Sequence, residues 1–275
     1  MDRSAPYCLV FDSGMGGLTV VDELKRLGFA GRISYAADTA VYPYGDKSDA
    51  DLTRRIPRLA EALYRAASPD IFVIACNTAS TLALEIVRAV LPIPIVGTVP
   101  AIKPAAALTR TGVIGVLATP GTLRRAYTEA LIYQFARERR VLTHGSVELV
   151  TLAERHAAGE PVTDAEIMAE LEGLMAQPGS ADMDVIVLAC THFPLLRERF
   201  QALLPDHISL IDSGEAIARR TQSLLFLDAV ANVSSGAQTA HSGTLYLPTE
   251  ISRDNRLVKV AARFGFQEIR QVEVD

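Results

Sequence analysis

Apolar and polar positions follow two alternating periods along almost the whole chain. Continuous apolar runs of strand length cover residues 7–11, 33–37, 71–75 and 185–189. Each run is followed by polar turn residues and then by apolar residues at helical spacing. Regular alternation of strands and helices is typical of parallel sheets that are covered by helices on both faces. The pattern therefore predicts an α/β fold.

The same criteria place the remaining elements. A capping box formed by Thr163 and Glu166 marks the start of one helix. Pro57 is expected to bend the helix around it or to mark the true start of that helix. Residues 229–243 are small and polar and predict a loop. Further strands are expected at 93–97, 113–118, 147–152, 208–211 and 244–247, and helices at 18–24, 52–63, 79–91, 123–135, 167–174 and 256–264.

Two short stretches of the chain occur twice. Residues 70–80 have a counterpart in residues 184–192, and each copy has an acidic start, an apolar strand and then a cysteine followed by polar residues. Residues 10–14 have a counterpart in 210–214, where an apolar strand again ends in Asp-Ser-Gly. Matched strand-to-turn units favour two similar halves over one irregular domain.

The crossing between the halves is expected where prolines are densest. Four prolines fall within residues 92–104, which is the strongest linker signal in the chain. We expect residues 1–97 and 210–275 to form one domain and residues 98–209 the other. Each should be a mostly parallel sheet flanked by helices. Because the loops at the carboxyl ends of strands form the ligand crevice in such sheets, the active site is expected at the domain interface.

Composition and charge narrow the classes of function. The chain has 275 residues and a formal net charge of −5, without a long basic run. This argues against a nucleic-acid surface as the main role and favours a small-molecule site. No apolar run is long enough to cross a bilayer, and residues 1–6 lead into a strand without a signal-peptide core, so we expect a cytoplasmic protein with no membrane partner.

The chain has three cysteines, which are far apart and do not resemble a disulfide framework. Cys8 lies in the middle of a strand and is interpreted as a core residue. Cys76 and Cys190 each follow a strand and precede a helical pattern, where the helix dipole is expected to lower the pKa of a thiol. A zinc site formed by Cys76, Cys190 and His192 is an alternative, although no paired cysteine and histidine spacing of the usual kind is present.

Two thiols that face each other across a ligand can invert a stereocentre. One thiolate takes a proton from a carbon and the other thiol returns a proton to the opposite face. Pyridoxal phosphate would require a Schiff-base lysine, and none of the four lysines lies convincingly at the end of a central strand, so no cofactor is expected. Asp12 either assists or only caps the turn after its strand. Glu154 is a further candidate carboxylate, and the glycine-rich turn at residues 14–17 is expected to bind an anion through its amides.

Four motifs in these regions resemble those of the glutamate racemases, cofactor-independent enzymes that supply D-glutamate for bacterial peptidoglycan. They cover residues 11–19, 43–48, 75–80 and 190–196 and occur in family order along nearly the whole chain. The resemblance implies two α/β domains with the active site between them. It also implies L-glutamate and D-glutamate as the substrate pair.

The resemblance further implies roles for individual residues. It assigns Cys76 and Cys190 as the acid and base pair, with Asp12 assisting on the Cys76 side and His192 with Glu154 on the Cys190 side. The positions that match substrate-binding residues of the family are Asp12, Ser13, Tyr44, Gly45, Asn77, Thr78, Thr191 and His192, together with a polar turn at Thr119 and Thr122. Asp212 and Ser213 are interpreted as structural counterparts of Asp12 and Ser13 only.

Some features leave partners and substrate open. Residues 99–101 and 145–150 are similar to the branch from Gram-negative bacteria, some members of which need a cell-wall precursor as activator. A homodimer is also left open. Within the same superfamily an aspartate racemase would use the same cysteine pair. A non-catalytic amino-acid binding protein is an alternative from another class, although it would not need a thiol in each half.

Overall fold

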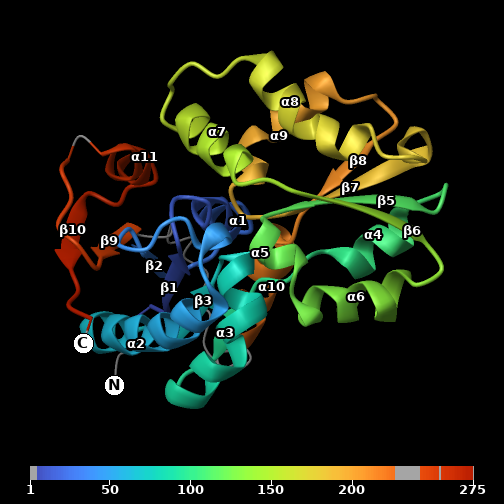
Figure 1. Ribbon diagram of the computed structural model, residues 1–275. Coiled ribbons are helices and arrows are strands. Elements are labelled where there is room, and N and C mark those ends of the chain that lie inside the picture. Colours follow the sequence, from blue (N-terminus) through green and yellow to red (C-terminus); the bar gives the residue numbers. More distant parts are fainter. Residues whose placement is uncertain (1–4, 227–241, 254, 275) are drawn as a thin grey trace.

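Two parallel sheets, each covered by helices on both faces, make up the computed structural model (Figure 1). The structure describes residues 5–226, 242–253 and 255–274. The first sheet has the strand order β10-β9-β2-β1-β3-β4, and all its pairs are parallel. Its strands are β1 (Tyr7–Asp12), β2 (Arg32–Ala37), β3 (Ile71–Ile74), β4 (Ile95–Gly97), β9 (Ser242–Leu247) and β10 (Glu268–Gln271).

The second sheet has the strand order β6-β5-β7-β8 and is also parallel throughout. Its strands are β5 (Val113–Ala118), β6 (Arg140–Gly145), β7 (Met183–Ala189) and β8 (Ser209–Ile211). The α/β class with two mostly parallel, helix-flanked sheets is therefore confirmed. The domain boundaries at 97/98 and 209/210 stay a prediction, and β8, which pairs with β7, spans the second of them.

Helices cover both faces of each sheet. In the first sheet α1, α10 and α11 pack on one face and α2 and α3 on the other. In the second sheet α7, α8 and α9 lie on one face and α4 and α6 on the other (Figure 1). The bounds are α1 (Leu18–Arg26), α2 (Asp49–Ala67), α3 (Asn77–Val90), α4 (Ile102–Leu108), α5 (Pro120–Leu123), α6 (Ala126–Ala136), α7 (Glu148–Ala157), α8 (Asp164–Met175), α9 (Arg197–Leu203), α10 (Gly214–Phe226) and α11 (Arg256–Arg263), with short 3-10 turns η1 (Tyr44–Asp46), η2 (Ser180–Asp182) and η3 (Phe193–Leu196).

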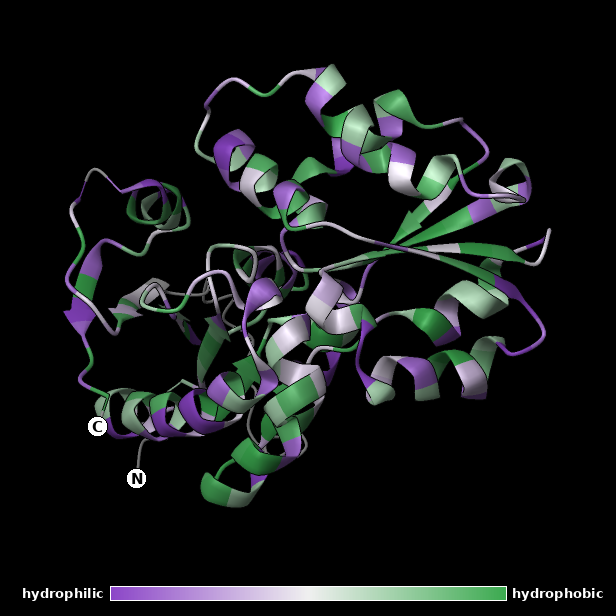
Figure 2. Ribbon diagram, viewed as in Figure 1, coloured by the Kyte–Doolittle hydropathy of each residue, from purple (hydrophilic) through white to green (hydrophobic). Residues whose placement is uncertain are grey.

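The central strands are buried and mostly apolar. Every residue of β3, β5 and β7 is buried. Figure 2 shows the same contrast in hydropathy, with hydrophobic central strands and helices that carry hydrophilic residues along one side. A strand covered on both faces has no solvent side, so it reads as a continuous apolar run rather than an alternating one.

The acidic residues that start the two long repeats have equivalent roles. Asp70 Oδ2 accepts a hydrogen bond from the backbone N–H of Tyr7 at 2.8 Å, at the start of β1. Asp184 accepts from the Thr109 hydroxyl at 2.5 Å and from the backbone N–H groups of Arg110 and Thr111 at 2.8 and 3.2 Å, just before β5. Each carboxylate therefore ties the start of its strand to the segment that enters the neighbouring strand.

The shorter repeat is preserved only locally. Asp12 and Asp212 each accept a hydrogen bond from the backbone N–H of the glycine two residues later, at 3.0 and 2.7 Å. However, β1 is central in the first sheet whereas β8 is at the edge of the second. Asp212 also forms an ion pair with Arg197, which lies in the second half.

The strand predicted at residues 147–152 is wrong, because this segment belongs to helix α7. Its buried residues Leu149, Val150, Leu152 and Ala153 follow helical spacing on one face. The β-branched valines suggested a strand. The helix is started by Ser146, whose hydroxyl accepts from the Leu149 backbone N–H at 2.8 Å.

Other differences have local causes. The prediction missed the strands β6 and β10, which lie at sheet edges and bury few side chains. It also missed the helices α10 and α4. Helix α4 can begin within the proline-rich segment, because a proline in the first helical turn gives up no hydrogen bond. Pro57 lies inside α2, which begins at Asp49, so Pro57 does not mark the helix start. The capping box of Thr163 and Glu166 is confirmed. Most of the loop predicted at 229–243 lies outside the described residues.

Replacing Asp184 tests its role at the start of β7. Asp184→Ala leaves two backbone N–H groups and a buried hydroxyl without their acceptor, and each such loss costs about 1–3 kcal/mol. We expect urea denaturation to show a free energy of unfolding that is lower than that of the wild type by at least about 1–3 kcal/mol. The matched control is Asp182→Ala, since Asp182 is exposed and should change stability by less than about 0.5 kcal/mol. Equal effects of the two substitutions would contradict this role.

Candidate active site

The carboxyl ends of the central strands of both sheets meet at one pocket. Asp12 ends β1, Cys76 follows β3, Thr119 follows β5 and Cys190 follows β7. Both cysteines line the pocket, one from each half of the structure. The full lining consists of Ser13, Pro43, Tyr44, Gly45, Cys76, Asn77, Thr78, Thr119, Val150, Cys190, Thr191 and His192.

Cys76 is the N-cap residue of α3 and is 6% exposed. Its Sγ lies 3.8 Å from the Ser13 hydroxyl oxygen. Burial and the negative charge of Asp12 raise the pKa of Cys76 to about 12, although hydrogen bonds from the Ala79 amide and Ser13 act in the other direction. The expectation that the helix N-terminus lowers this pKa is therefore wrong for Cys76, because desolvation and a nearby carboxylate outweigh the helix dipole.

Cys190 lies at the inner end of a chain of three polar groups. Its Sγ is 3.9 Å from His192 Nδ1, and His192 Nε2 is 3.0 Å from Glu154 Oε1. His192 is 2% exposed. Burial lowers the pKa of His192, but the contacts with Cys190 and Glu154 raise it by more, so that it lies well above its ordinary value. His192 is therefore an imidazolium at neutral pH, held between a sulfur and a carboxylate.

Asp12 links the two halves. It is fully buried, and its Oδ2 accepts a hydrogen bond from the Thr191 hydroxyl at 2.7 Å. Its Oδ1 accepts from the Ser13 hydroxyl at 3.2 Å and from the Gly14 backbone N–H at 3.0 Å. Asp12 thus caps its own turn and also binds the residue that follows Cys190.

The glycine-rich turn is satisfied by carboxylates of the chain itself. Besides the bond from Gly14 to Asp12, the Met15 backbone N–H donates to Glu154 Oε1 at 3.4 Å. The anions at this turn are therefore Asp12 and Glu154, one from each half. Gly16 is needed for the close approach, since a Cβ there would lie 2.7 Å from both the Thr191 hydroxyl oxygen and the His192 backbone nitrogen.

Three threonine hydroxyls form a second connection between the halves. The Thr78 hydroxyl, on α3, lies 3.0 Å from that of Thr119 and 3.2 Å from that of Thr122, and the last two are 3.0 Å apart. Thr122 is fully buried and is not part of the pocket lining. Gly45 packs against Thr119, since a Cβ on Gly45 would lie 2.8 Å from that of Thr119. The structure thus brings together three of the four predicted threonines, Thr78, Thr119 and Thr122.

The Tyr44 side chain is held by a network that the sequence analysis missed. Its hydroxyl donates to Asp38 Oδ2 at 2.5 Å. Asp38 is fully buried and is paired with Arg55 of α2 through two bonds of 2.5 and 2.6 Å. Asp38 could have been found by the rule that identified Asp12, because it also comes directly after a strand.

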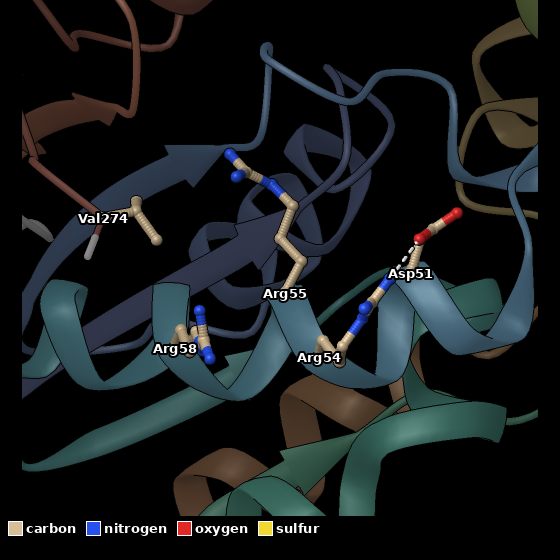
Figure 3. Close-up of a pocket in the computed structure, with 5 residues that line it drawn as sticks. All are labelled: Asp51, Arg54, Arg55, Arg58 and Val274. Atoms are coloured by element: carbon tan, nitrogen blue, oxygen red, sulfur yellow. Dashed lines mark hydrogen bonds and ion pairs between the residues drawn. The ribbon is translucent and has the colours of Figure 1, made fainter.

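Arg55 also lines a separate hollow between α2 and the end of the chain, with Asp51, Arg54, Arg58 and Val274 (Figure 3). The dashed line in Figure 3 marks the ion pair of Arg54 with Asp51, at 2.7 Å. None of the residues predicted for the active site lines this hollow.

Asn77 is the first residue of α3 and is 4% exposed. Its Oδ1 is buried without a hydrogen-bond partner among the described residues. Buried acceptors are rarely left unpaired. Since Asn77 lines the pocket, this oxygen is available to a donor group of a ligand.

The described residues contain neither a metal-type cluster of side chains nor a helix of membrane-spanning type. No group of three or more His, Cys, Asp and Glu side chains in this part of the chain is arranged to hold a metal ion. No helix within it has the length and apolar character that crossing a membrane requires.

The protonation state of Cys76 can be measured in a variant in which Cys8 and Cys190 are alanine. We expect the ultraviolet absorbance of the thiolate to stay absent through mildly alkaline solution, since the pKa of Cys76 is raised to about 12. Adding Asp12→Asn should lower this pKa, because the charge of Asp12 disfavours the thiolate. Asp22→Asn, at an exposed position on α1, is the control. A thiolate signal at neutral pH would contradict this assignment.

Comparison with known proteins places the chain in a family. The sequence model of the family described as Asp/Glu/Hydantoin racemase matches residues 20–221. The glutamate racemase of Sphingopyxis alaskensis is 51% identical over 216 residues, which cover 78% of this chain and 81% of the relative. That of Salmonella gallinarum is 42% identical over 269 residues, which cover 98% of this chain and 93% of the relative.

The structural comparison agrees. The crystal structure of Escherichia coli glutamate racemase in complex with L-glutamate and the activator UDP-MurNAc-Ala superposes with a TM-score of 0.88 and 39% sequence identity. The superposition covers 98% of this chain and 99% of the E. coli chain. The chain therefore belongs to the Asp/Glu/Hydantoin racemase family and, within it, to the glutamate racemases, which are isomerases.

Proposed function

We propose that this enzyme interconverts L-glutamate and D-glutamate without a cofactor, with Cys76 and Cys190 as the two acid and base groups. The observation that carries the proposal is the lining of one pocket by two thiols from opposite halves of the structure. Two-base racemisation needs one proton-transfer group on each face of the substrate carbon. The glutamate specificity is supported by the relatives, which are glutamate racemases over nearly the whole chain.

The two thiols have different surroundings. Cys76 is held as a neutral thiol by burial and by Asp12. The sulfur of Cys190 lies 3.9 Å from Nδ1 of His192, a group whose pKa is raised well above its ordinary value. We assign Cys190 as the base and Cys76 as the acid in one direction of the reaction, with the two roles exchanged in the other direction.

The reaction removes one proton from the α-carbon and delivers one to it. The Cys190 sulfur forms an S–H bond as the Cα–H bond of glutamate breaks, and the electron pair remains on Cα and its carboxylate. The S–H bond of Cys76 then breaks and a new Cα–H bond forms on the opposite face. After the step Cys76 is the thiolate and Cys190 the thiol, which is the state required for the other enantiomer.

The chief difficulty is the low acidity of the α-proton, since each pKa unit of mismatch with the thiol costs about 1.36 kcal/mol. Polar groups that line the pocket, including Asn77, Thr78 and Thr119, are placed to stabilise the substrate carboxylates and the developing charge. The unpaired Oδ1 of Asn77 is an acceptor for the substrate ammonium group. That ammonium group also offsets the charge of Asp12 and so favours the Cys76 thiolate.

The pocket is almost filled by its own side chains. About 10 Å³ of it is free, which is room for roughly one water molecule. Glutamate is much larger, so the two halves or their loops must separate to admit it. Closure afterwards would exclude water and strengthen the electrostatic interactions within the site.

We propose a cellular role in supplying D-glutamate for peptidoglycan, as the family resemblance implies. A cell-wall precursor of the kind bound to the E. coli enzyme is a candidate activator, supported by 39% identity over 98% of this chain. The cytoplasmic location, a homodimer and the division into domains at 97/98 and 209/210 stay predictions.

Deuterium exchange at Cα tests the proposed substrate. The enzyme is incubated in heavy water with L-glutamate or L-aspartate, and deuterium at Cα is followed by proton NMR. We expect incorporation with glutamate only. Exchange with aspartate instead would indicate an aspartate racemase, and binding of an amino acid without exchange would indicate a non-catalytic binding protein.

Single substitutions test the two-base assignment. Cys76→Ser and Cys190→Ser should each lower kcat for racemisation by roughly 100- to 10,000-fold, the range typical of loss of a general acid or base. Each variant keeps one active-site thiol and is expected to retain binding of glutamate. Cys8→Ser is the matched control, because Cys8 is buried in the core away from the pocket. Racemisation at the wild-type rate by either active-site variant would refute the assignment.

Substitution of His192 tests the unequal environments of the thiols. His192→Asn removes the positive charge beside Cys190, so the direction in which Cys190 acts as base should lose more in kcat than the other. Because the two enantiomers have equal free energies in solution, kcat/KM must fall equally in both directions. Circular dichroism, which follows the change from each enantiomer, measures kcat and KM in both directions. Equal losses of kcat in the two directions would show that His192 does not act specifically on the Cys190 side.

A further inference from the structure

Arg125 is a buried cation outside the cysteine chemistry. It lies between α5 and α6 in the second half of the structure and is 5% exposed. Buried guanidinium groups require nearly all their donors to be paired. Its contacts therefore indicate what the residue does.

The hydrogen bonds of the guanidinium group lead to the first half. Nη2 and Nε donate to the two carboxylate oxygens of Asp49, at 2.7 and 3.3 Å. Nη1 donates to the backbone carbonyl of Thr78 at 2.9 Å and to the Thr81 hydroxyl at 3.3 Å. Asp49 is the first residue of α2, whereas Thr78 and Thr81 are in α3. One side chain thus joins two helices of the first half to the second half.

These contacts lie at the wall of the active site. Thr78 lines the pocket, two residues after Cys76. While Arg125 holds the carbonyl of Thr78, the hydroxyl of Thr78 contacts Thr119 and Thr122. Arg125 also lowers the pKa of Asp49 through its hydrogen bond, so Asp49 is a carboxylate at neutral pH. The ion pair is therefore intact under the conditions in which the enzyme works.

We infer that Arg125 is a positioning residue that clamps the two halves in the closed form and fixes the first turn of α3 beside Cys76. The inference rests on the proposed function and on the small free space of the pocket, which identifies this form as closed. When the clamp opens, Asp49 and the carbonyl of Thr78 lose their shared partner together. Closure around glutamate restores both contacts at once.

The test compares Arg125→Gln with the matched control Arg124→Gln. Arg124 is adjacent and exposed, and it contributes to the lowered pKa of Asp49 only through its charge, without a hydrogen bond to it among the described residues. Arg125→Gln should raise KM for both glutamate enantiomers by roughly 10- to 100-fold, the range expected for loss of hydrogen bonds to a charged group, with a smaller change in kcat. Arg124→Gln should leave KM within about twofold, as for a surface substitution.

Further variants separate positioning from folding. Asp49→Asn keeps a hydrogen-bond acceptor for Arg125 but removes the charge, so it should raise KM less than Arg125→Gln. Arg125→Lys should raise KM less than Arg125→Gln, because the ammonium group keeps the positive charge. The KM should still exceed that of the wild type, because one ammonium group cannot span Asp49 and Thr78 as the planar guanidinium does. The dissociation constant of D-glutamate, measured by calorimetry, should rise with KM across the series. Thermal melting identifies any variant that acts by unfolding.

The outcomes are distinct from those that test the proposed function. If Cys76→Ser and Cys190→Ser are inactive but Arg125→Gln has the wild-type KM and dissociation constant, only the clamp is refuted. An equal rise in KM for Arg124→Gln would also refute it. If both cysteine variants racemise normally, the proposed function fails whatever the result at Arg125.

Discussion

The hydrogen bond from the Thr191 hydroxyl to Asp12, at 2.7 Å, marks the constraint on which the site depends. It joins the carboxyl end of a central strand in one sheet to the equivalent edge of the other sheet. Each edge alone would carry a single thiol and a few polar side chains. Held face to face, they enclose one pocket with a thiol from each side.

The two edges can approach this closely because glycines lie where the halves touch. Gly16 leaves room for Thr191 and His192, and Gly45 leaves room for Thr119. Two ionisable groups at the junction have partners across it: Glu154 accepts from the Met15 amide, and Arg125 is paired with Asp49. Glu154 also contacts His192 within the second half. A charge removed from water is costly unless it is paired, so these contacts favour the closed form in which every partner is present.

The sequence predicted the class of fold and the pocket residues more reliably than the local structure. The rule that polar residues after parallel strands share one edge applied to Asp12, Cys76 and Cys190, and the structure brings these together. Glu154 reaches His192 although the strand predicted before it is a helix. Glu154 is a candidate because it follows the expected strand, and its role beside His192 comes from the family resemblance.

What could not be predicted depends on contacts between distant segments. The raised pKa of Cys76 follows from burial and from Asp12, which no local pattern shows. Arg125 and Asp38 have no motif around them, and their roles appear only when the partner helices are in place. The edge strands β6 and β10 bury too few side chains to give an apolar pattern.

The central claim is that the two sulfur atoms bracket the α-carbon of one bound glutamate. The most direct measurement is a crystal structure of this enzyme with D-glutamate in the pocket. We predict that the Sγ atoms of Cys76 and Cys190 lie against the α-carbon of the ligand on opposite faces. A bound glutamate whose α-carbon lies against only one of the two sulfurs would contradict this claim.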